Sequence, residues 1–313
     1  MDEESSGRAF RIWHDPAPRT IEAAILCTLA YADLFDYPMT SAEIRRHLVG
    51  WKADPHDVQS ALDHDTLGHH VVRSGEYYTL SGREPLVEIR LERARAAAAA
   101  WPWAIRYGQA IARLPFIHLV AVTGALAVDN AGPADNIDCF IVTAPDRLWL
   151  SRAVTIQFVV KPALRRGITL CPNYLLSELA LADFDHDLFT AHEIVQMVPI
   201  AGQETYRRLC SLNTWVSRYL PNAFGQPRPL PRQAREPNAI FPLAERILRT
   251  PIGGWAERWE MKRKIDRFTR RAHRNSEVLM SADRCKAHFE RHARLVREAF
   301  FSRLASFDDV QLT

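Results

Sequence analysis

The chain has 313 residues, of which 47% are hydrophobic and 25% charged, a composition typical of a globular protein with ample core. The formal net charge of +3 is too small to indicate, by itself, binding to nucleic acid or to an anionic membrane. No apolar run is long enough to span a bilayer, and the acidic, polar segment that opens the sequence does not resemble a signal peptide.

The first part of the chain is expected to hold a tail and a small domain. Residues 1–19 lack hydrophobic periodicity and predict a mobile tail. Three stretches of helical spacing then precede two short apolar runs joined by a Ser-Gly-Glu turn. The predicted helices and strands span 20–35, 41–50, 54–67, 71–73 and 77–80. Three helices followed by a β-hairpin is the order of a winged helix, so we predict a winged-helix-like domain over residues 20–83.

The third predicted helix argues against DNA as a ligand. A winged helix that binds DNA normally inserts this helix into the groove, where its cations meet phosphates and base edges. Here the segment carries four acids and no Lys or Arg. The acids are Asp54, Asp57, Asp63 and Asp65. We therefore expect this domain to pack on its neighbouring domain or on a partner protein.

Residues 84–220 predict an α+β domain with a small mixed sheet and flanking helices. Its elements follow in the order helix, strand, strand, helix, strand. Their predicted ranges are 86–113, 118–122, 139–142, 146–165 and 168–176. The Ala-rich, charged composition favours the first helix, and Pro115 ends it before the first strand begins.

The turn between the first two strands carries the candidate site. The first strand runs into Thr123-Gly124-Ala125, and Asn136-Ile137-Asp138 leads into the second strand. Glycine at such a turn lets the backbone approach a phosphate closely. Residues 136 and 138 are separated by one residue, so their side chains are expected to point to the same face of the sheet. Oxygen ligands placed in this way suit Mg²⁺.

These residues resemble the site of the polymerase-β-like nucleotidyltransferase superfamily, in which a Gly-Ser turn, a short loop and an acid–apolar–acid motif follow one another. More loosely, residues 20–220 resemble bacterial proteins that join a winged-helix-like domain to such a domain. The resemblance implies a nucleotide at Gly124 and Ala125 and Mg²⁺ at Asp138 and Asn136. It also implies transfer of a nucleoside monophosphate from a triphosphate to an acceptor that the sequence does not name.

The chain departs from the family pattern at three places. Ala125 stands where a serine hydroxyl is expected, and Asn136 stands where the first carboxylate is expected. The third strand has no acid, and its polar candidate is Asn173. Of three expected carboxylates only Asp138 remains. Two hypotheses therefore stay open: a metal-dependent transferase, and an inactive member of the fold that binds nucleotide, RNA or a protein partner.

Two other acids are candidates for the missing carboxylate. Asp135 would need a bulge to reach the face of Asp138, because a one-residue shift along a strand reverses the facing of its side chains. Glu193 could supply a carboxylate from a later helix. A capping box explains it as well, because Thr190 and Glu193 form a T-x-x-E pattern.

The last third of the chain predicts a Pro-rich linker over 221–242 and a helical region over 243–313. Within it, residues 255–274 predict an amphipathic basic helix with Trp255, Trp259, Met261, Ile265 and Phe268 interleaved among cations. The cations are Arg258, Lys262, Arg263, Lys264, Arg267, Arg270, Arg271 and Arg274. The helix is expected to dock on the sheet with a solvated cationic face, and RNA, a protein or a membrane surface are candidate partners for that face.

Three smaller patterns complete the sequence. The five cysteines are scattered and odd in number, so we expect free thiols and a cytoplasmic protein. Asp183, Asp185 and Asp187 alternate as in a calcium loop but lack its glycine and glutamate, which favours a solvated loop. For a trio of residues at helical spacing we expect core and surface positions rather than a zinc site, because three residues on one helix are weak support for zinc binding. Its members are Cys285, His288 and His292.

Overall fold

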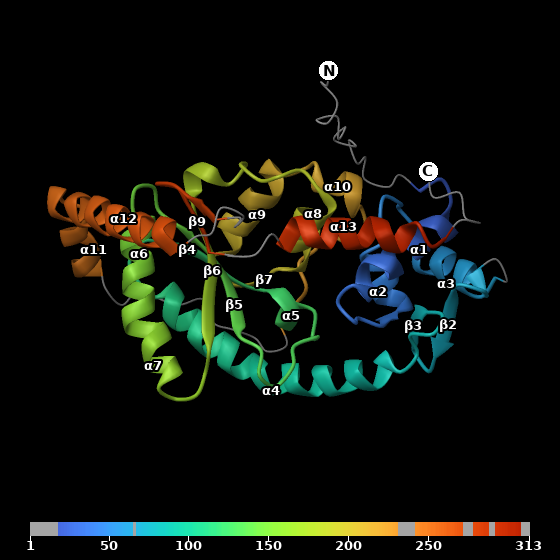
Figure 1. Ribbon diagram of the computed structural model, residues 1–313. Helices are drawn as coiled ribbons and strands as arrows, with labels where there is room; N and C mark the ends of the chain where they lie inside the picture. Colours follow the sequence, from blue (N-terminus) through green and yellow to red (C-terminus); the bar gives the residue numbers. More distant parts are fainter. Residues whose placement is uncertain (1–17, 65–66, 231–241, 272–277, 288–291, 308–313) are drawn as a thin grey trace, which may run out of the picture.

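The computed structural model describes residues 18–64, 67–230, 242–271, 278–287 and 292–307. The predicted tail lies outside the described residues except for its last two positions, and so do residues 231–241 of the Pro-rich segment. The described chain is a mixed α+β structure with one three-stranded and one six-stranded sheet (Figure 1). None of its described helices combines the length and hydrophobicity required to cross a membrane.

The N-terminal unit has the predicted order of three helices and a hairpin, with one additional short strand. The helices are α1 (Ile21–Asp33), α2 (Ser41–Arg46) and α3 (Pro55–Leu62), and the strands are β1 (Met39–Thr40), β2 (Val71–Ser74) and β3 (Tyr77–Leu80). The strands lie in the order β1-β3-β2, and both pairs are antiparallel. The predicted ranges of the second and third helices extend beyond the ends of α2 and α3.

Side-chain caps explain where these three helices begin. Thr20 accepts a hydrogen bond from the backbone N–H of Ala23 at 3.1 Å and so starts α1. Helix α2 begins at a reciprocal capping box formed by Thr40 and Glu43, and α3 begins at one formed by Asp54 and Asp57. Each cap satisfies backbone N–H groups that the first turn of a helix leaves without a partner.

The six-stranded sheet has the order β7-β4-β5-β6-β9-β8. Its strands are β4 (Ile117–Thr123), β5 (Ile137–Thr143), β6 (Leu170–Ser177), β7 (Val198–Ala201), β8 (Val278–Met280) and β9 (Arg284–Ala287). β5 runs antiparallel to β4 and parallel to β6, which confirms the mixed sheet. The one-turn helix α5 (Gly124–Ala127) follows β4 directly.

Side chains that alternate along β4 and β5 enter two different cores. Val120, Val122 and Ile141 pack in a core with the long helix α4 (Leu86–Ala112) and with α6 (Leu148–Thr155), while Ala121 and Phe140 pack in the other core. The latter also contains residues of α8 (Leu188–Gln196), α9 (Gln203–Leu212), α10 (Val216–Tyr219), α13 (His292–Leu304) and the N-terminal unit. The N-terminal unit and one face of the sheet therefore share a single hydrophobic core.

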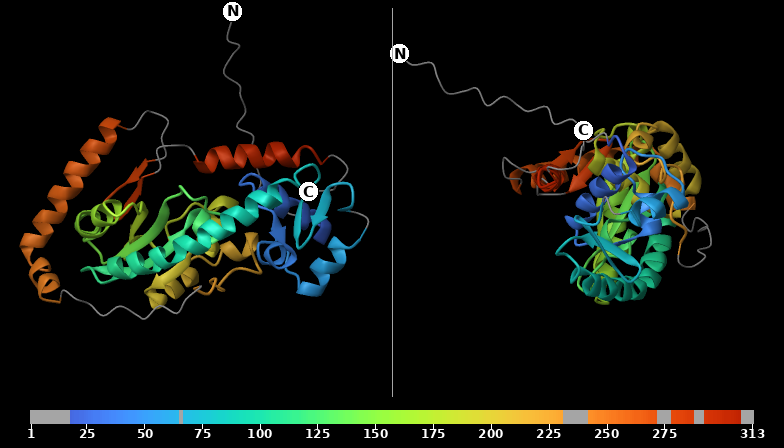
Figure 2. Two further views of the ribbon diagram at one scale, coloured as in Figure 1. Left: turned by 90° about the horizontal axis from the view of Figure 1, so that it is seen from below. Right: turned by 90° about the vertical axis from the view of Figure 1, so that its right-hand side faces the viewer.

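The remaining helices flank the sheet on the other side. A π-helical turn (Ile156–Val160) and α7 (Lys161–Leu164) continue α6, and a short 3₁₀ turn (Glu178–Ala180) follows β6. Helices α11 (Pro242–Leu248) and α12 (Pro251–Arg271) come after the undescribed part of the Pro-rich segment, and α12 packs against α6. Two views place α12 and the N-terminal unit at opposite ends of the molecule (Figure 2).

The prediction of an all-helical C-terminal region is wrong for residues 278–287. This segment forms the hairpin β8–β9, and β9 pairs with β6 in antiparallel register, with Cys285 opposite Leu175. The hairpin covers what would otherwise be an unpaired sheet edge, and this long-range pairing overrides the local helical pattern. Because Cys285 lies on a strand and His292 begins α13, the Cys-His-His trio does not share one helix face; His288 lies outside the described residues.

The beginning of the predicted linker is packed rather than extended. Asn222 is buried and joins the N-terminal unit, because its amide donates to the carbonyl of Trp51 and accepts from the N–H of Ala53. Arg228 donates to the carbonyl of Ala127 and forms a short ion pair with Asp129. The proline content predicted the absence of regular secondary structure here. It did not predict that this segment packs against the N-terminal unit and the residues around the end of α5.

Arg90 of α4 ties the N-terminal unit to the sheet. Its guanidinium is buried, lies over the ring of Tyr37, and pairs with Glu43 at 3.1 Å. It also donates to the carbonyl of Asp129, which follows α5. A buried charge is costly unless it is paired and hydrogen-bonded, so these contacts must persist together.

Replacing Arg90 by methionine should destabilise the fold by about 3 kcal/mol, because the change leaves Glu43 half-buried without its cation. The exposed Arg95 on the same helix is the matched control, and its replacement by methionine should change stability by less than about 0.5 kcal/mol. Urea denaturation measures both values. Equal stability of the two variants would show that the Arg90 contacts contribute little.

Candidate functional site

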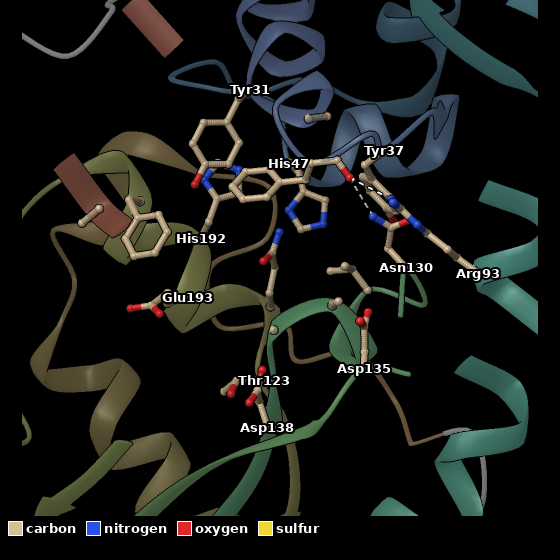
Figure 3. A pocket seen from close by; sticks show the side chains of 18 of the residues that line it. Tyr31, Tyr37, His47, Arg93, Thr123, Asn130, Asp135, Asp138, His192 and Glu193 are labelled. Atoms are coloured by element: carbon tan, nitrogen blue, oxygen red, sulfur yellow. Dashed lines mark hydrogen bonds between the residues drawn. The ribbon is translucent and has the colours of Figure 1, made fainter. Parts of the chain in front are cut away.

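A cavity of about 390 Å³ lies between the N-terminal unit, the sheet and α8 (Figure 3). Its floor comes from the end of β4, from α5 and from the start of β5, and its roof comes from α1, β1, the residue that follows α2, and α8. This volume falls in the range of sites for small molecules and cofactors. Gly124, Ala125 and Asp138, three of the four residues predicted from sequence, line it.

The backbone at Gly124 and the side chain of Asp138 meet on the cavity floor. The register of β4 and β5 places Thr123 opposite Asp138. Gly124 has φ +66°, and a Cβ atom added there would lie 2.7 Å from Asp138 Oδ2. Such an approach excludes every residue with a side chain unless the carboxylate moves. The sequence prediction that this turn and residue 138 form one site agrees with this geometry.

Asp138 is a half-buried carboxylate without a cationic partner among the described residues. Burial raises its pKa to about 6, and the negative charge of Asp135 adds to this rise. The Cys171 thiol donates a hydrogen bond that acts in the opposite direction. An acid kept ionised near neutral pH in such a place favours an approaching cation.

Asp135, rather than Asn136, accompanies Asp138 in the cavity. Asn136 is exposed and does not line the cavity, whereas Asp135 does. The expectation of a bulge assumed that the strand already includes residue 136, but β5 begins at Ile137. Before it, the Asp135 carboxylate accepts a hydrogen bond from the Gly132 N–H at 2.7 Å in a tight turn. Side-chain alternation therefore does not apply at this position.

The other polar candidates also reach the cavity. Asn173 of β6 and Glu193 of α8 both line it, together with Lys286 of β9. The predicted capping box is wrong, because Asp187 is the residue that caps α8, by accepting from the N–H of Thr190. Glu193 lies beyond the first turn and forms an ion pair with Lys286 at 3.7 Å. Its charge is thus offset within the protein.

The roof of the cavity is aromatic and contains two histidines that the sequence analysis missed. The ring of His192 stacks on Tyr31 with centroids 4.0 Å apart, and His47 lies parallel to His192 at 5.8 Å. His192 Nδ1 donates to the carbonyl of Leu188 at 3.0 Å. Burial lowers the pKa of His192 to about 4 and also lowers that of His47, so both rings are neutral at pH 7.

Two buried polar atoms around the roof have no hydrogen-bond partner in the part of the chain that the structure describes. One is Nδ1 of His47 and the other is Oδ1 of Asn130, whose amide nitrogen donates to the carbonyl of Phe35. Both residues line the cavity and are more than nine-tenths buried. Groups of this kind are normally satisfied, so a ligand with polar atoms on a planar edge fits this part of the cavity.

The cavity therefore has an anionic, oxygen-rich floor and an aromatic roof. Among the described residues, a set of three clustered metal-ligand side chains occurs at the start of α3, not in the cavity. That set is Asp54, His56 and Asp57. It is exposed, and its two carboxylates already accept the backbone N–H groups of the capping box. It could hold a metal ion, but it lies outside the cavity.

Comparison of the chain with protein-family models, with curated proteins and with solved structures finds no match. The cavity and its residues are therefore the basis for any functional conclusion.

Replacing Gly124 by alanine should destabilise the protein by about 3 kcal/mol, since it combines a strained positive φ with the contact against Asp138. Gly75 is the matched control, because it has φ +63° and open space around its Cβ position. Replacing Gly75 by alanine should destabilise the protein by about 1 kcal/mol, because only the strain of the positive φ contributes there. Thermal or urea unfolding measures both, and equal losses would refute the close approach.

Stability should fall as the pH drops from 7 to 5. The unfolded chain binds protons at His47 and His192 in this range, whereas the folded chain excludes them because both pKa values are lowered. His192 should account for about 2 kcal/mol between these two pH values, and His47 contributes in the same direction. His192→Phe keeps the ring stack on Tyr31 and should reduce the pH dependence, while the exposed His56→Phe should not. Urea unfolding at both pH values tests this, and an unchanged slope in His192→Phe would contradict it.

Proposed function

We propose that this chain is a nucleotide-binding protein of the nucleotidyltransferase type, with the phosphates at the Gly124 turn and Mg²⁺ beside Asp138. The observation that carries the proposal is the approach of the Gly124 backbone to the Asp138 carboxylate on the floor of the cavity. A residue without a side chain leaves space for phosphate oxygens beside a carboxylate that can share a metal ion with them.

The donor set of the floor fits a hard divalent cation. Asp135 and Asp138 offer carboxylate oxygens, and Asn173 offers an amide oxygen. Mg²⁺ prefers oxygen ligands and usually keeps waters and substrate phosphates in its coordination shell. The mutual repulsion of the two carboxylates, and the burial that raises the pKa of Asp138, would both be offset by such an ion.

The roof supports a nucleobase as the other end of the ligand. Tyr31, His47 and His192 form a stack of parallel rings beside the cavity, and neutral rings suit a planar aromatic ligand. The unpartnered atoms of His47 and Asn130 could accept or donate hydrogen bonds at the edge of a base. In this arrangement the N-terminal unit, which has the helix and strand order of a winged helix, contributes to nucleotide recognition rather than to DNA binding.

Transfer of a nucleoside monophosphate is the second candidate function. It is favoured by Asp135, which gives the cavity two carboxylates where the sequence pattern retained one. When bound, Mg²⁺ would polarise the phosphoryl oxygens and lower the pKa of an attacking hydroxyl. The charge of the third nearby acid, Glu193, is already offset by Lys286. Binding without transfer therefore agrees best with the described residues.

Nucleoside triphosphates with Mg²⁺ should raise the Tm by about 5 °C at about 100 times Kd. The rise should require Mg²⁺, should disappear in Asp138→Asn, and should weaken in Asp135→Asn. Asn136→Asp is the matched control, because this residue is exposed outside the cavity and its new charge should leave the shift unchanged. A shift that survives both chelation and Asp138→Asn would place the nucleotide elsewhere.

The same variants separate binding from transfer. Incubation with α-labelled triphosphates, Mg²⁺ and acceptors such as RNA or the protein itself should transfer label only if the second candidate function holds. Label that depends on Asp138 would establish transfer. Nucleotide binding without label would leave the binding function in place.

A further inference from the structure

Helix α12 follows its sequence pattern only in part, because Met261 and Ile265 pack against the core as predicted but its first turns do not. Two acids, Glu257 and Glu260, turn inward and are 6% and 5% exposed. Trp255 and Trp259, expected to belong to the apolar, buried stripe, are 63% and 54% exposed, and Ile252 is 70% exposed. Large apolar side chains in such positions indicate an interaction surface.

The buried acids explain this orientation. The Glu257 carboxylate accepts hydrogen bonds from the backbone N–H groups of Trp149 and Leu150, at 2.8 and 2.6 Å, at the start of α6. Those N–H groups have no partner within α6, and the positive end of the helix favours an anion there. Glu260 forms ion pairs with Arg263 and Lys264. The carboxylates of Glu257 and Glu260 therefore both have hydrogen-bond or ion-pair partners within the protein.

The outward face of α12 consequently presents aromatic rings and cations. The rings of Trp255 and Trp259 are nearly parallel, with centroids 6.4 Å apart, and the Arg263 guanidinium lies over Trp259 at 5.1 Å. Further along, the exposed side chains are charged, and Asp266 is the one acid among those the structure describes on this face. The exposed cations are Arg258, Lys262, Arg263, Arg267 and Arg270. From Arg258 to Arg270 they span about 18 Å.

We propose that this face of α12 binds single-stranded nucleic acid. Trp255 and Trp259 stack on bases, and the cations that follow them hold the phosphates. Aromatic rings beside a basic track are the features that bind single strands without base-specific hydrogen bonds. Arginine, the commonest cation on this face, both stacks on rings and binds phosphate through paired N–H groups.

A membrane surface fits this face less well. A helix that lies in the bilayer interface presents an apolar stripe along its length. The exposed apolar side chains described on α12 end at Trp259, and the turns that follow carry charged side chains on the exposed side. Helix α12 lies at the opposite end of the molecule from the N-terminal unit, which contributes to the cavity roof, so this proposal does not rest on the proposed nucleotide site (Figure 2).

The test uses the full chain and a fluorescein-labelled, mixed-sequence 20-nucleotide RNA, with binding followed by fluorescence anisotropy at 50–200 mM salt. Each of Trp255→Ala and Trp259→Ala should weaken binding about tenfold, as expected for loss of one stacked base. Trp103→Ala is the matched control, because Trp103 on α4 is also exposed, stacks on Tyr107 and has Arg106 over its ring. It should leave affinity unchanged.

Charge variants give a second, independent measurement. Arg258→Gln combined with Lys262→Gln should reduce the slope of log affinity against log salt by about 1.4, or 0.7 for each lost phosphate contact. The exposed pair Arg207→Gln and Arg208→Gln on α9 should leave the slope unchanged. Circular dichroism and Tm confirm that each variant is folded, and Asp138→Asn should bind the RNA as the wild type does.

Three outcomes would overturn the proposal. One is the absence of RNA binding by the wild-type chain at 50 mM salt. Another is binding that neither the tryptophan nor the charge variants weaken. The last is co-sedimentation with vesicles of phosphatidylcholine and phosphatidylglycerol that depends on Trp255 and Trp259 while RNA does not bind, which would assign this face to a membrane.

Discussion

The antiparallel pairing of β4 and β5 is the constraint on which the site depends. It sets Thr123 opposite Asp138 and turns the chain at Gly124, so that backbone and carboxylate share the cavity floor. Hydrogen bonds along both strands hold this arrangement, and hydrophobic cores on both faces of the sheet support it. The cost is a half-buried acid that has no cationic partner among the described residues and whose pKa is raised. Burial of such a carboxylate disfavours its charged form, so a binding role explains its presence better than a contribution to stability does.

The cavity is shared between two parts of the chain that are distant in sequence. Its floor belongs to the large sheet, whereas most of its roof belongs to the N-terminal unit and the rest to α8, and one continuous core contains residues of all three. Arg90, Asn222 and the ion pair between Asp33 and Arg303 hold these parts together from three directions. A ligand in the cavity would therefore meet a roof that is already in place, which lowers the entropic cost of binding.

Helix α12 shows how charge satisfaction can decide which face of a helix is buried. Glu257 gains two backbone hydrogen bonds at the start of α6, and this places the tryptophans outside. Hydrophobic periodicity alone predicts the reverse. The two proposals, nucleotide binding in the cavity and single-stranded nucleic acid on the outward face of α12, therefore concern two separate surfaces of the molecule.

The sequence by itself determined the order of the first helices and strands, the turn at Gly124 and the position of Asp138 beside that turn. Caps, turns and strand alternation depend on residues close together in the chain. The tertiary structure alone decided that Asp135 rather than Asn136 lines the cavity and that two histidines belong to its roof. It also decided that residues 278–287 form a hairpin and that Glu193 pairs with Lys286. Each of these depends on contacts with distant segments, and local patterns do not specify which distant partner a side chain or strand edge will meet.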